Sequence, residues 1–448
     1  MTELVIRGGT VITPHGAVFA DIAVDEGRIS TIAPELSGAT REIDARGLTV
    51  LPGLIDIHVH FNEPGRTDWE GSATGSRALA AGGGTTFFDM PLNSSPCTVG
   101  PAEFDQKRTA LEQSSITDFG LWGGIIPGNR SALAELAARG VIGFKAFMAD
   151  SGLPEFPRCD DQTLYEGMRE AAQFQLPVAV HAEDDEILSK LSSAAVARGR
   201  TGIRDFLDSR PVSAEVTAIQ RASLLAAETG VKLHIVHVSS GSGVAAALEA
   251  RAKGADISIE TCPHYLFFTE EDMERIGALA KCAPPLRNAS ERQTLWDALM
   301  RNHIDVVASD HSPAPPEMKR DANFFKVWGG IAGVQCSLAV LLTAGHRDKG
   351  LPLPRIAELT AAWPARRFGL AHKGIIAVNN DADLVLVDLS ASCKLTEDRL
   401  LQRHRMSPYV DESFCGVVCQ TLLRGQSIFA EGKIVAASSG KFISAHGN

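Results

Sequence analysis

"GLIDIHVHFNEPG", residues 53–65, brings two histidines to the end of an apolar run. Successive side chains of a β-strand point to opposite faces, so residues i and i+2 share a face. We therefore expect His58 and His60 to project together where this strand ends, just ahead of the turn at Pro64 and Gly65. That arrangement suits a metal ion, and a pair of half-buried strand histidines is the alternative.

Length, charge and cysteine content restrict the class of protein. The chain has 448 residues, a net charge of −11 and no run of Lys or Arg, so neither nucleic acid nor an anionic membrane surface is an expected partner. The N-terminus meets Gly and Pro before a signal-peptide core can form, and the longest apolar run, near 331–342, is too short for a membrane span. Eight scattered cysteines without a CxxC pair indicate reduced thiols. We expect a cytoplasmic protein.

The distribution of apolar residues indicates two kinds of structure. Both ends of the chain are rich in short strands and turns, which predicts one small β-sandwich domain from 1–50 and 374–448. In 51–373, eight apolar, β-branched runs alternate with Ala- and Leu-rich helical stretches. Eight such repeats predict an α/β fold, a (β/α)₈ TIM barrel whose active site lies at the carboxyl ends of its strands. Two long polar connections, 150–161 and 313–330, are expected to act as lids.

Six side chains suited to metal binding or catalysis fall at the carboxyl ends of the predicted barrel strands. Taken singly, each has an ordinary interpretation as a core histidine, a strand-end lysine or a turn residue. Together, four neutral imidazoles and one carboxylate suit borderline divalent ions, Zn²⁺ first and Co²⁺ or Mn²⁺ as alternatives. Five such ligands are too many for one tetrahedral ion and suit two ions. The six residues are His58, His60, Lys145, His181, His237 and Asp310.

Lys145 differs from the other five because an ammonium has only donors and cannot bridge two cations. Reaction with CO₂ converts a lysine to a carbamate (N6-carboxylysine), whose two oxygens can each bind one metal. A Schiff-base lysine is the alternative. Two metals would hold a bridging hydroxide, and Asp310 is expected to take its proton and pass it to the departing nitrogen. The predicted reaction is hydrolysis of an amide-like bond.

Two further histidines lie near this set. His264, in "TCPHYL", also follows a predicted strand, and a place beside the ligands or at the substrate edge is as open as a core role. His234 lies three residues before His237, so we expect it to face the opposite side and to be structural.

These motifs also resemble those of a known family, the cyclic amidohydrolases (dihydroorotases, hydantoinases, dihydropyrimidinases and allantoinases). The resemblance covers nearly the whole chain and implies a metal-dependent barrel, a small β-sandwich and assembly as a homotetramer. It also implies that one metal binds His58, His60, Lys145 and Asp310, and that the other binds Lys145, His181 and His237. The motifs are "PGLIDIHVH", "GFKAFM", "VAVHAED", "HIVHVSS", "TCPHYL" and "SDHSP".

Within the family, the departures indicate the substrate. Dihydroorotases typically have Arg where this chain has Asn62, to hold a carboxylate, and hydantoinases and dihydropyrimidinases have Tyr near the position of Asp150. By contrast, "FNEPGRTDWEG", "DMPLNSSPCT", "GFKAFMADSGLPEF", "KCAPPLR" and "SDHSPAPPEMK" resemble the allantoinase branch, which opens the hydantoin ring of allantoin to allantoate in purine breakdown. The neutral ureido arm of allantoin suits amide and hydroxyl partners. The expected contacts are Asn62, Asn93, Ser312 and the backbone at Ala283 and Gly330, with Asp150 and His264 as further candidates.

Two other functions remain open from the sequence. A hydantoinase, dihydropyrimidinase or dihydroorotase would act on a different cyclic amide with the same ligands. Some proteins of this fold have lost their ligands and serve as non-catalytic scaffolds, and the complete set of six ligands argues against that alternative.

Overall fold

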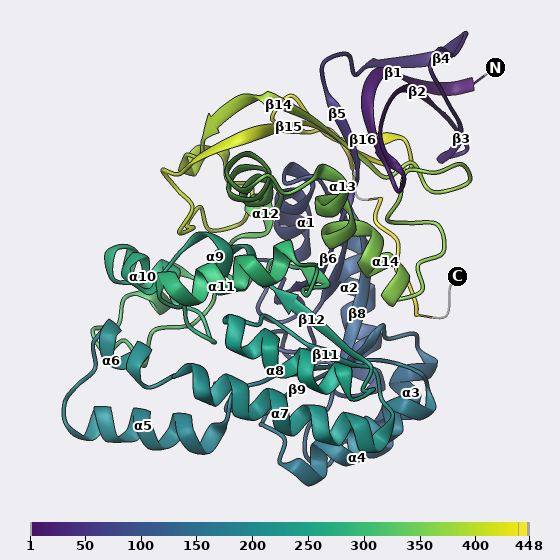
Figure 1. Ribbon diagram of the computed structural model, residues 1–448. Helices are drawn as coiled ribbons and strands as arrows, with labels where there is room; N and C mark the ends of the chain where they lie inside the picture. The colour runs from purple at the N-terminus through teal and green to yellow at the C-terminus, as the bar shows by residue number, and fades with distance from the viewer. Residues whose placement is uncertain (1, 438, 446–448) are drawn as a thin grey trace.

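The computed structural model describes residues 2–437 and 439–445, and its central feature is a ring of eight parallel strands (Figure 1). Their order in the sheet follows the sequence, from β6 to β13. An isolated parallel bridge between Val59 and His311 joins the last strand to the first. The predicted TIM barrel is therefore confirmed. The strands are β6 (Leu54–Val59), β7 (Gly84–Asp89), β8 (Asp118–Gly124), β9 (Gly143–Phe147), β10 (Val178–His181), β11 (Leu233–Ile235), β12 (Ile257–Thr261) and β13 (Val306–Val307).

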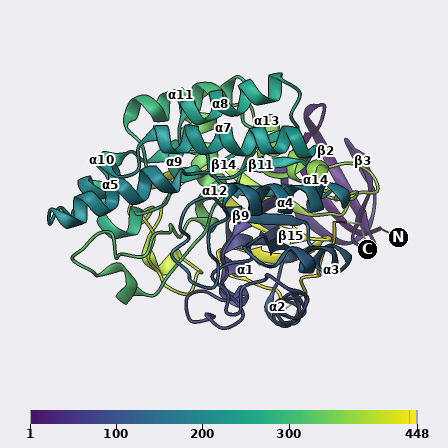
Figure 2. The ribbon, with the colours of Figure 1, turned by 90° about the horizontal axis from the view of Figure 1, so that it is seen from below.

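Helices surround the barrel, as the view from below also shows (Figure 2). Polar side chains cap several of them: Asp160 accepts from the backbone of Thr163 at the start of α4, and Ser240 accepts from Gly243 at the start of α8. The α-helices are α1 (Ser72–Ala81), α2 (Pro101–Ser114), α3 (Leu133–Ala138), α4 (Asp161–Gln173), α5 (Asp185–Ala197), α6 (Ile203–Asp208), α7 (Val212–Thr229), α8 (Gly241–Ala252), α9 (Pro263–Phe267), α10 (Glu270–Ile276), α11 (Ala289–Met300), α12 (Ser337–Val340), α13 (Leu353–Ala357) and α14 (Trp363–Arg367).

Shorter helical turns complete the connections. They are η1 (Arg130–Ala132), η2 (Gly277–Ala280), η3 (Pro316–Lys319), η4 (Val334–Cys336), η5 (Leu341–Arg347), η6 (Glu358–Ala362) and η7 (Glu397–Arg399). One stretch read as strand from the sequence, 256–265, ends its strand at Thr261 and continues as α9. Pro263 is the first residue of α9, where a missing N–H costs nothing.

The second sheet joins the two ends of the chain. Its nine strands run in the order β17–β16–β15–β14–β5–β1–β2–β3, with β4 beside β1. The β domain that we predicted from both termini as a small sandwich is found as a separate mixed sheet, in which β1 runs parallel to β4 and β5. The domain boundaries at 50 and 374 stay a prediction. The strands are β1 (Thr2–Thr13), β2 (Gly16–Asp25), β3 (Arg28–Ala33), β4 (Ala39–Asp44), β5 (Thr49–Pro52), β14 (Leu384–Lys394), β15 (Ser413–Leu423), β16 (Gln426–Ala430) and β17 (Lys433–Ile434).

The barrel strands β6, β7 and β8 are buried over their whole length, because they are covered from both sides. Aromatic rings fill the space between strands; Phe87 and Phe119, for example, stack with ring centres 5.9 Å apart. Among the described residues, no helix combines the length and the apolar character needed to cross a bilayer. Because side chains fill the barrel interior, we expect a site at the carboxyl ends of the strands.

Candidate metal centre and active site

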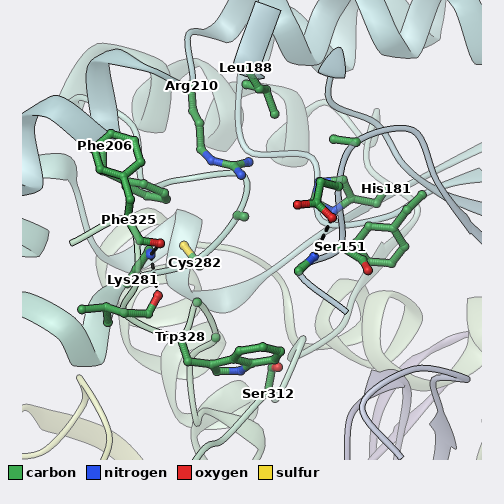
Figure 3. A pocket seen from close by; sticks show the side chains of 18 of the residues that line it. Ser151, His181, Leu188, Phe206, Arg210, Lys281, Cys282, Ser312, Phe325 and Trp328 are labelled. Carbon is green, nitrogen blue, oxygen red and sulfur yellow. Dashed lines mark hydrogen bonds between the residues drawn. The ribbon is translucent and has the colours of Figure 1, made fainter. Parts of the chain in front are cut away.

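A cavity of about 480 Å³ opens at the carboxyl ends of the barrel strands (Figure 3), a size ordinary for small-molecule sites. It brings together most of the residues expected from the sequence. Lys145, Asn62 and His264 are buried outside its lining. The expected residues in the lining are His58, His60, Asn93, Asp150, His181, His237, Ala283, Asp310, Ser312 and Gly330.

One carboxylate draws the first two histidines together. Asp310 Oδ1 lies 3.3 Å from His58 Nε2 and 3.4 Å from His60 Nε2. The three residues place their ligand atoms within 4.8 Å of one another, a spacing that suits one metal ion. Burial opposes ionisation of Asp310, but the two imidazoles outweigh it and hold the pKa of Asp310 at about 2. The carboxylate is therefore ionised at neutral pH.

The second pair of histidines, His181 and His237, lies next to His58. The ring of His237 lies 5.5 Å from that of His58 and 4.7 Å from that of His181, measured between centroids. His181 Nδ1 faces His237 Nε2 at 3.0 Å, and His237 Nδ1 has no hydrogen-bond partner. Burial lowers the pKa of His60, His181 and His237, which favours the neutral form that metal binding requires.

Lys145 lies on β9, beneath the cavity, with its side chain fully buried. Its Nζ has no hydrogen-bond partner and sits 5.0 Å from the ring centre of Phe147. Burial lowers the pKa of Lys145 to about 8, although Glu260 and Asp310 oppose that shift. A buried amine without an acceptor is costly unless another group engages it.

Two buried glutamates that the sequence reasoning missed orient the histidines. The Nδ1–H of His58 donates to Glu260 Oε1 at 2.8 Å, and the Nε2–H of His181 donates to Glu183 Oε2 at 2.9 Å. Each bond puts the ring proton on the nitrogen beside the glutamate. The other nitrogen, which faces Asp310 in His58 and His237 in His181, keeps a lone pair that can bind a metal. Glu260 also pairs with His234 at 3.1 Å, which agrees with a structural role for that residue. The available signal was a Glu inside the apolar strand run "ISIET".

The backbone turns sharply at four expected site residues. The φ angles of Asn62, Asn93, His237 and Asp310 are 64°, 71°, 40° and 46°, in the left-handed region that L residues rarely adopt. Strained positions of this kind gather at functional sites. The turns end the strands and direct these side chains.

The donor set fits divalent metal ions. Neutral imidazoles with oriented nitrogens, an ionised carboxylate and an unpartnered buried amine surround the floor of one cavity. Two ring nitrogens of the cluster, His60 Nδ1 and His237 Nδ1, have no hydrogen-bond partner among the described residues, and the ligand atoms of His58, His60 and Asp310 lie close enough together to share one ion. A second grouping, Cys262, His264 and Asp310, shares the same carboxylate.

Some of the expected substrate contacts line the cavity, and the others are buried outside its lining. Asn93 Nδ2 lies 3.4 Å from Ser312 Oγ in the cavity wall, and the backbone at Ala283 and Gly330 lines the same wall. Asp150 is exposed at the cavity edge, where its N–H donates to Asp185 at 3.0 Å.

Asn62 and His264 lie away from the open cavity. Asn62 is fully buried, its Nδ2 lies 3.4 Å from the carbonyl of Pro313, and its Oδ1 has no partner. With its φ of 64°, this favours the interpretation that Asn62 shapes the turn. His264 is buried beside Tyr265 with Nε2 unpartnered, and burial lowers the pKa of His264 to about 4. Their substrate contacts stay predictions.

Both connections expected to act as lids contribute to the cavity wall. Residues 150–152 and 325–330 line it, together with Arg210 and Phe206 from the α6–α7 region. Buried ammonium groups hold the second connection: Lys319 Nζ donates to the carbonyls of Trp328 and Gly330 at 2.9 and 2.8 Å. The sequence did not indicate Arg210, because nothing in the local pattern "SRPVSAE" places it near the strand ends.

The comparisons with known proteins agree with this geometry. Residues 49–428 match the model of the amidohydrolase family. Proteins named allantoinase from Solibacter usitatus (strain Ellin6076) and Rubrobacter xylanophilus (strain DSM 9941) are 65% and 54% identical, over 99% and 98% of this chain and 97% of each relative. A solved L-hydantoinase (dihydropyrimidinase) from Arthrobacter aurescens superposes with a TM-score of 0.96 at 33% identity, over 99% of this chain and 100% of that one. From its ligand cluster, its barrel and these matches, the chain belongs to the amidohydrolase family.

Proposed function

We propose that this protein is an allantoinase, which hydrolyses the ring amide of allantoin to give allantoate in purine breakdown. The observation that carries the proposal is the 65% identity, over almost the full length, to a protein named allantoinase. The hydantoinase is more distant, at 33% identity, although its fold is nearly the same. Allantoin is itself a hydantoin ring with a neutral ureido arm, so both activities need the same ring chemistry and differ in what holds the arm.

Two divalent ions fit the donor set, with Zn²⁺ preferred and Co²⁺ or Mn²⁺ as alternatives. His58, His60 and Asp310 would hold one ion, His181 and His237 the other, and Lys145 both. When bound, such ions lower the pKa of water and polarise the carbonyl under attack. Lys145 would serve as a carbamate formed with CO₂. Its buried, unpartnered Nζ supports this, because the lowered pKa keeps a share of the amine neutral and able to react.

Asp310 is placed to move the proton. Its carboxylate is ionised, lies between two imidazoles and lines the cavity, so it can accept a proton from the attacking water. The water oxygen bonds to the ring carbonyl carbon, and the ring C–N bond breaks. Asp310 then gives the proton to the departing nitrogen, which leaves a ureido group and a carboxylic acid, and the acid loses its remaining proton to the solvent.

The cavity wall suits a neutral substrate. Asn93 offers an amide and Ser312 a hydroxyl, and each can donate or accept a hydrogen bond with a urea group. Backbone groups at Ala283 and Gly330 complete the proposed contacts, with Asp150 at the edge.

A comparison of allantoin, hydantoin and dihydroorotate as substrates tests the proposal, with metal content measured on the same sample. We expect ring opening of allantoin with the highest kcat/KM and about two metals per chain. A higher kcat/KM on hydantoin would favour the second candidate, a hydantoinase, which the TM-score of 0.96 supports. Full metal loading without turnover of any ring would point to a scaffold.

The proposal also covers the cellular location, the partners and the assembly of the protein. All eight cysteines are free thiols, and five of them are buried, which suits a reducing cytoplasm. We expect neither nucleic acid nor membrane as a partner, because the net charge is −11. A homotetramer is the expected assembly, and light scattering of the purified protein measures it.

A further inference from the structure

Arg210 places a guanidinium in the wall of the active-site cavity, in the short connection between α6 and α7. Figure 3 shows the group extending from its backbone into the cavity, toward the side where His181 lies. The side chain is 21% exposed, so part of the guanidinium remains open to a ligand. We propose that Arg210 is a substrate-binding residue, whose N–H groups donate to a carbonyl oxygen of the substrate's neutral ureido arm. This inference rests on the proposed function.

The surroundings hold Arg210 in one orientation. Its Nη1 donates to Glu183 Oε2, the same oxygen that accepts from His181. Its backbone carbonyl accepts from Arg287, and its guanidinium carbon lies 5.4 Å from the ring centre of Phe206. A donor fixed in advance loses little entropy when a ligand arrives. Because Glu183 also orients His181, the arm contact and the metal-binding histidine share one carboxylate.

Unused donors face the cavity. A guanidinium has five N–H groups, and within residues 2–437 and 439–445 the Nε and Nη2 of Arg210 have no acceptor. Lys281, another cation of the cavity wall, offers no such donors, because its Nζ already donates to the carbonyls of Phe324 and Val327 at 2.6 and 2.5 Å. Arg210 is therefore the better placed of these two cations for a carbonyl oxygen of the substrate.

The charge of the Arg210–Glu183 pair indicates which kind of substrate arm it binds. Glu183 is fully buried, and its carboxylate forms an ion pair with the guanidinium of Arg210. The Arg210–Glu183 pair is thus neutral as a unit and keeps N–H groups in place without a net positive charge. A carboxylate would gain little at such a pair, whereas the oxygen of a urea gains hydrogen bonds.

The test compares the metal-loaded wild-type enzyme with Arg210→Met on allantoin and on hydantoin, which has the ring but no arm. We expect KM for allantoin to rise about tenfold or more, with kcat changed less than about threefold, since a lost polar contact weakens binding of the arm alone. Because Glu183 also orients His181, the constants for hydantoin, as substrate or competitive inhibitor, serve as the reference: the loss on allantoin should exceed the loss on hydantoin about tenfold at equal metal content. Arg210→Lys should keep the ion pair but not the planar fork, so KM for allantoin stays raised.

Two further variants separate a contact between Arg210 and the substrate from an effect on the orientation of His181. Glu183→Gln should lower kcat on both rings through His181, and Arg204→Met, an exposed change on α6, is the control for losing a cation. Equal losses on allantoin and hydantoin in both Arg210 variants would overturn the proposal, as would a change confined to dihydroorotate. Failure of the wild-type enzyme to open allantoin would instead reject the proposed function, whatever the variants do.

Discussion

Lys145 is the residue on which the chemistry depends most. Its side chain is fully buried, its amine has no hydrogen-bond partner among the described residues, and its charge contributes to the lowered pKa of His181 and His237. We expect Lys145→Ala and Lys145→Arg to lose metal and activity alike, because Ala removes the bridge and Arg keeps a cation that cannot form a carbamate. Metal analysis and allantoin turnover measure both, with Lys253→Met, an exposed change on the surface, as the control. Two metals and full activity in Lys145→Ala would reject the bridging role.

Asp310 separates proton transfer from metal assembly. In Asp310→Asn the amide keeps an oxygen beside His58 and His60 but cannot accept a proton. We expect kcat to fall by about 10² or more while the fold and much of the metal remain. Steady-state kinetics and metal content on one preparation give the answer, and a near-normal kcat would mean that another group carries the proton.

For Asn62 the sequence predicted a contact with the substrate, and the structure shows a buried residue at a φ of 64°. The strand ends at Val59, so the alternation of side chains along a strand does not fix the direction of Asn62. Asn62→Gly should keep kcat/KM within about threefold, because Gly adopts this φ freely, whereas Asn62→Ala should cost about 1 kcal/mol of stability. A large rise in KM for allantoin in Asn62→Gly would restore the substrate contact.

At the level of strands and helices, the sequence predicted the barrel well because periodicity is a local property. All eight apolar runs form strands, and the five helices expected from their Ala- and Leu-rich pattern are α1, α3, α4, α7 and α8. The pattern could not show where each strand stops. β11 ends at Ile235, before His237, and β13 ends at Val307, before Asp310. The left-handed backbone conformation of His237 and Asp310 then sets the direction of their side chains. Glu260 and Arg210 escaped prediction because only the closed barrel brings them to the site, whereas Glu183 follows His181 by two residues and was missed within the motif "VAVHAED".

A buried charge cluster ties the barrel to the terminal sheet. Lys373 Nζ lies 2.9 Å from Asp118, at the start of β8, and 2.5 Å from Asp383, next to β14. Lys373→Met would leave the buried carboxylate of Asp383 without its cation and Asp118 with Arg424 alone, and we expect it to lower the free energy of unfolding by roughly 3 kcal/mol. The matched exposed change, Lys394→Met, breaks the pair with Asp411 and should cost less than about 1 kcal/mol. Denaturant unfolding compares the two, and equal effects would show that the cluster does not join the sheets.

For the whole molecule, the two sheets have different tasks. The barrel carries every residue of the expected ligand set, and the mixed sheet pairs strands from the two ends of the chain. Sequence motifs indicated that these residues lie together because each motif sits at a strand end, where its position in the barrel is fixed by topology. The arrangement of the nine terminal strands in one mixed sheet depends on pairing between residues hundreds of positions apart, such as Val50 and Leu386, which local patterns do not encode.

A metal titration tests the central claim, that a two-metal site with a carbamate on Lys145 opens the allantoin ring. Apo-protein prepared by chelation is titrated with Zn²⁺, with and without bicarbonate, while allantoin hydrolysis and bound metal are followed together. We expect activity to rise until about two ions are bound per chain, and to recover more fully with bicarbonate present. Full allantoin turnover at one ion per chain, or in the chelated protein, would contradict the claim.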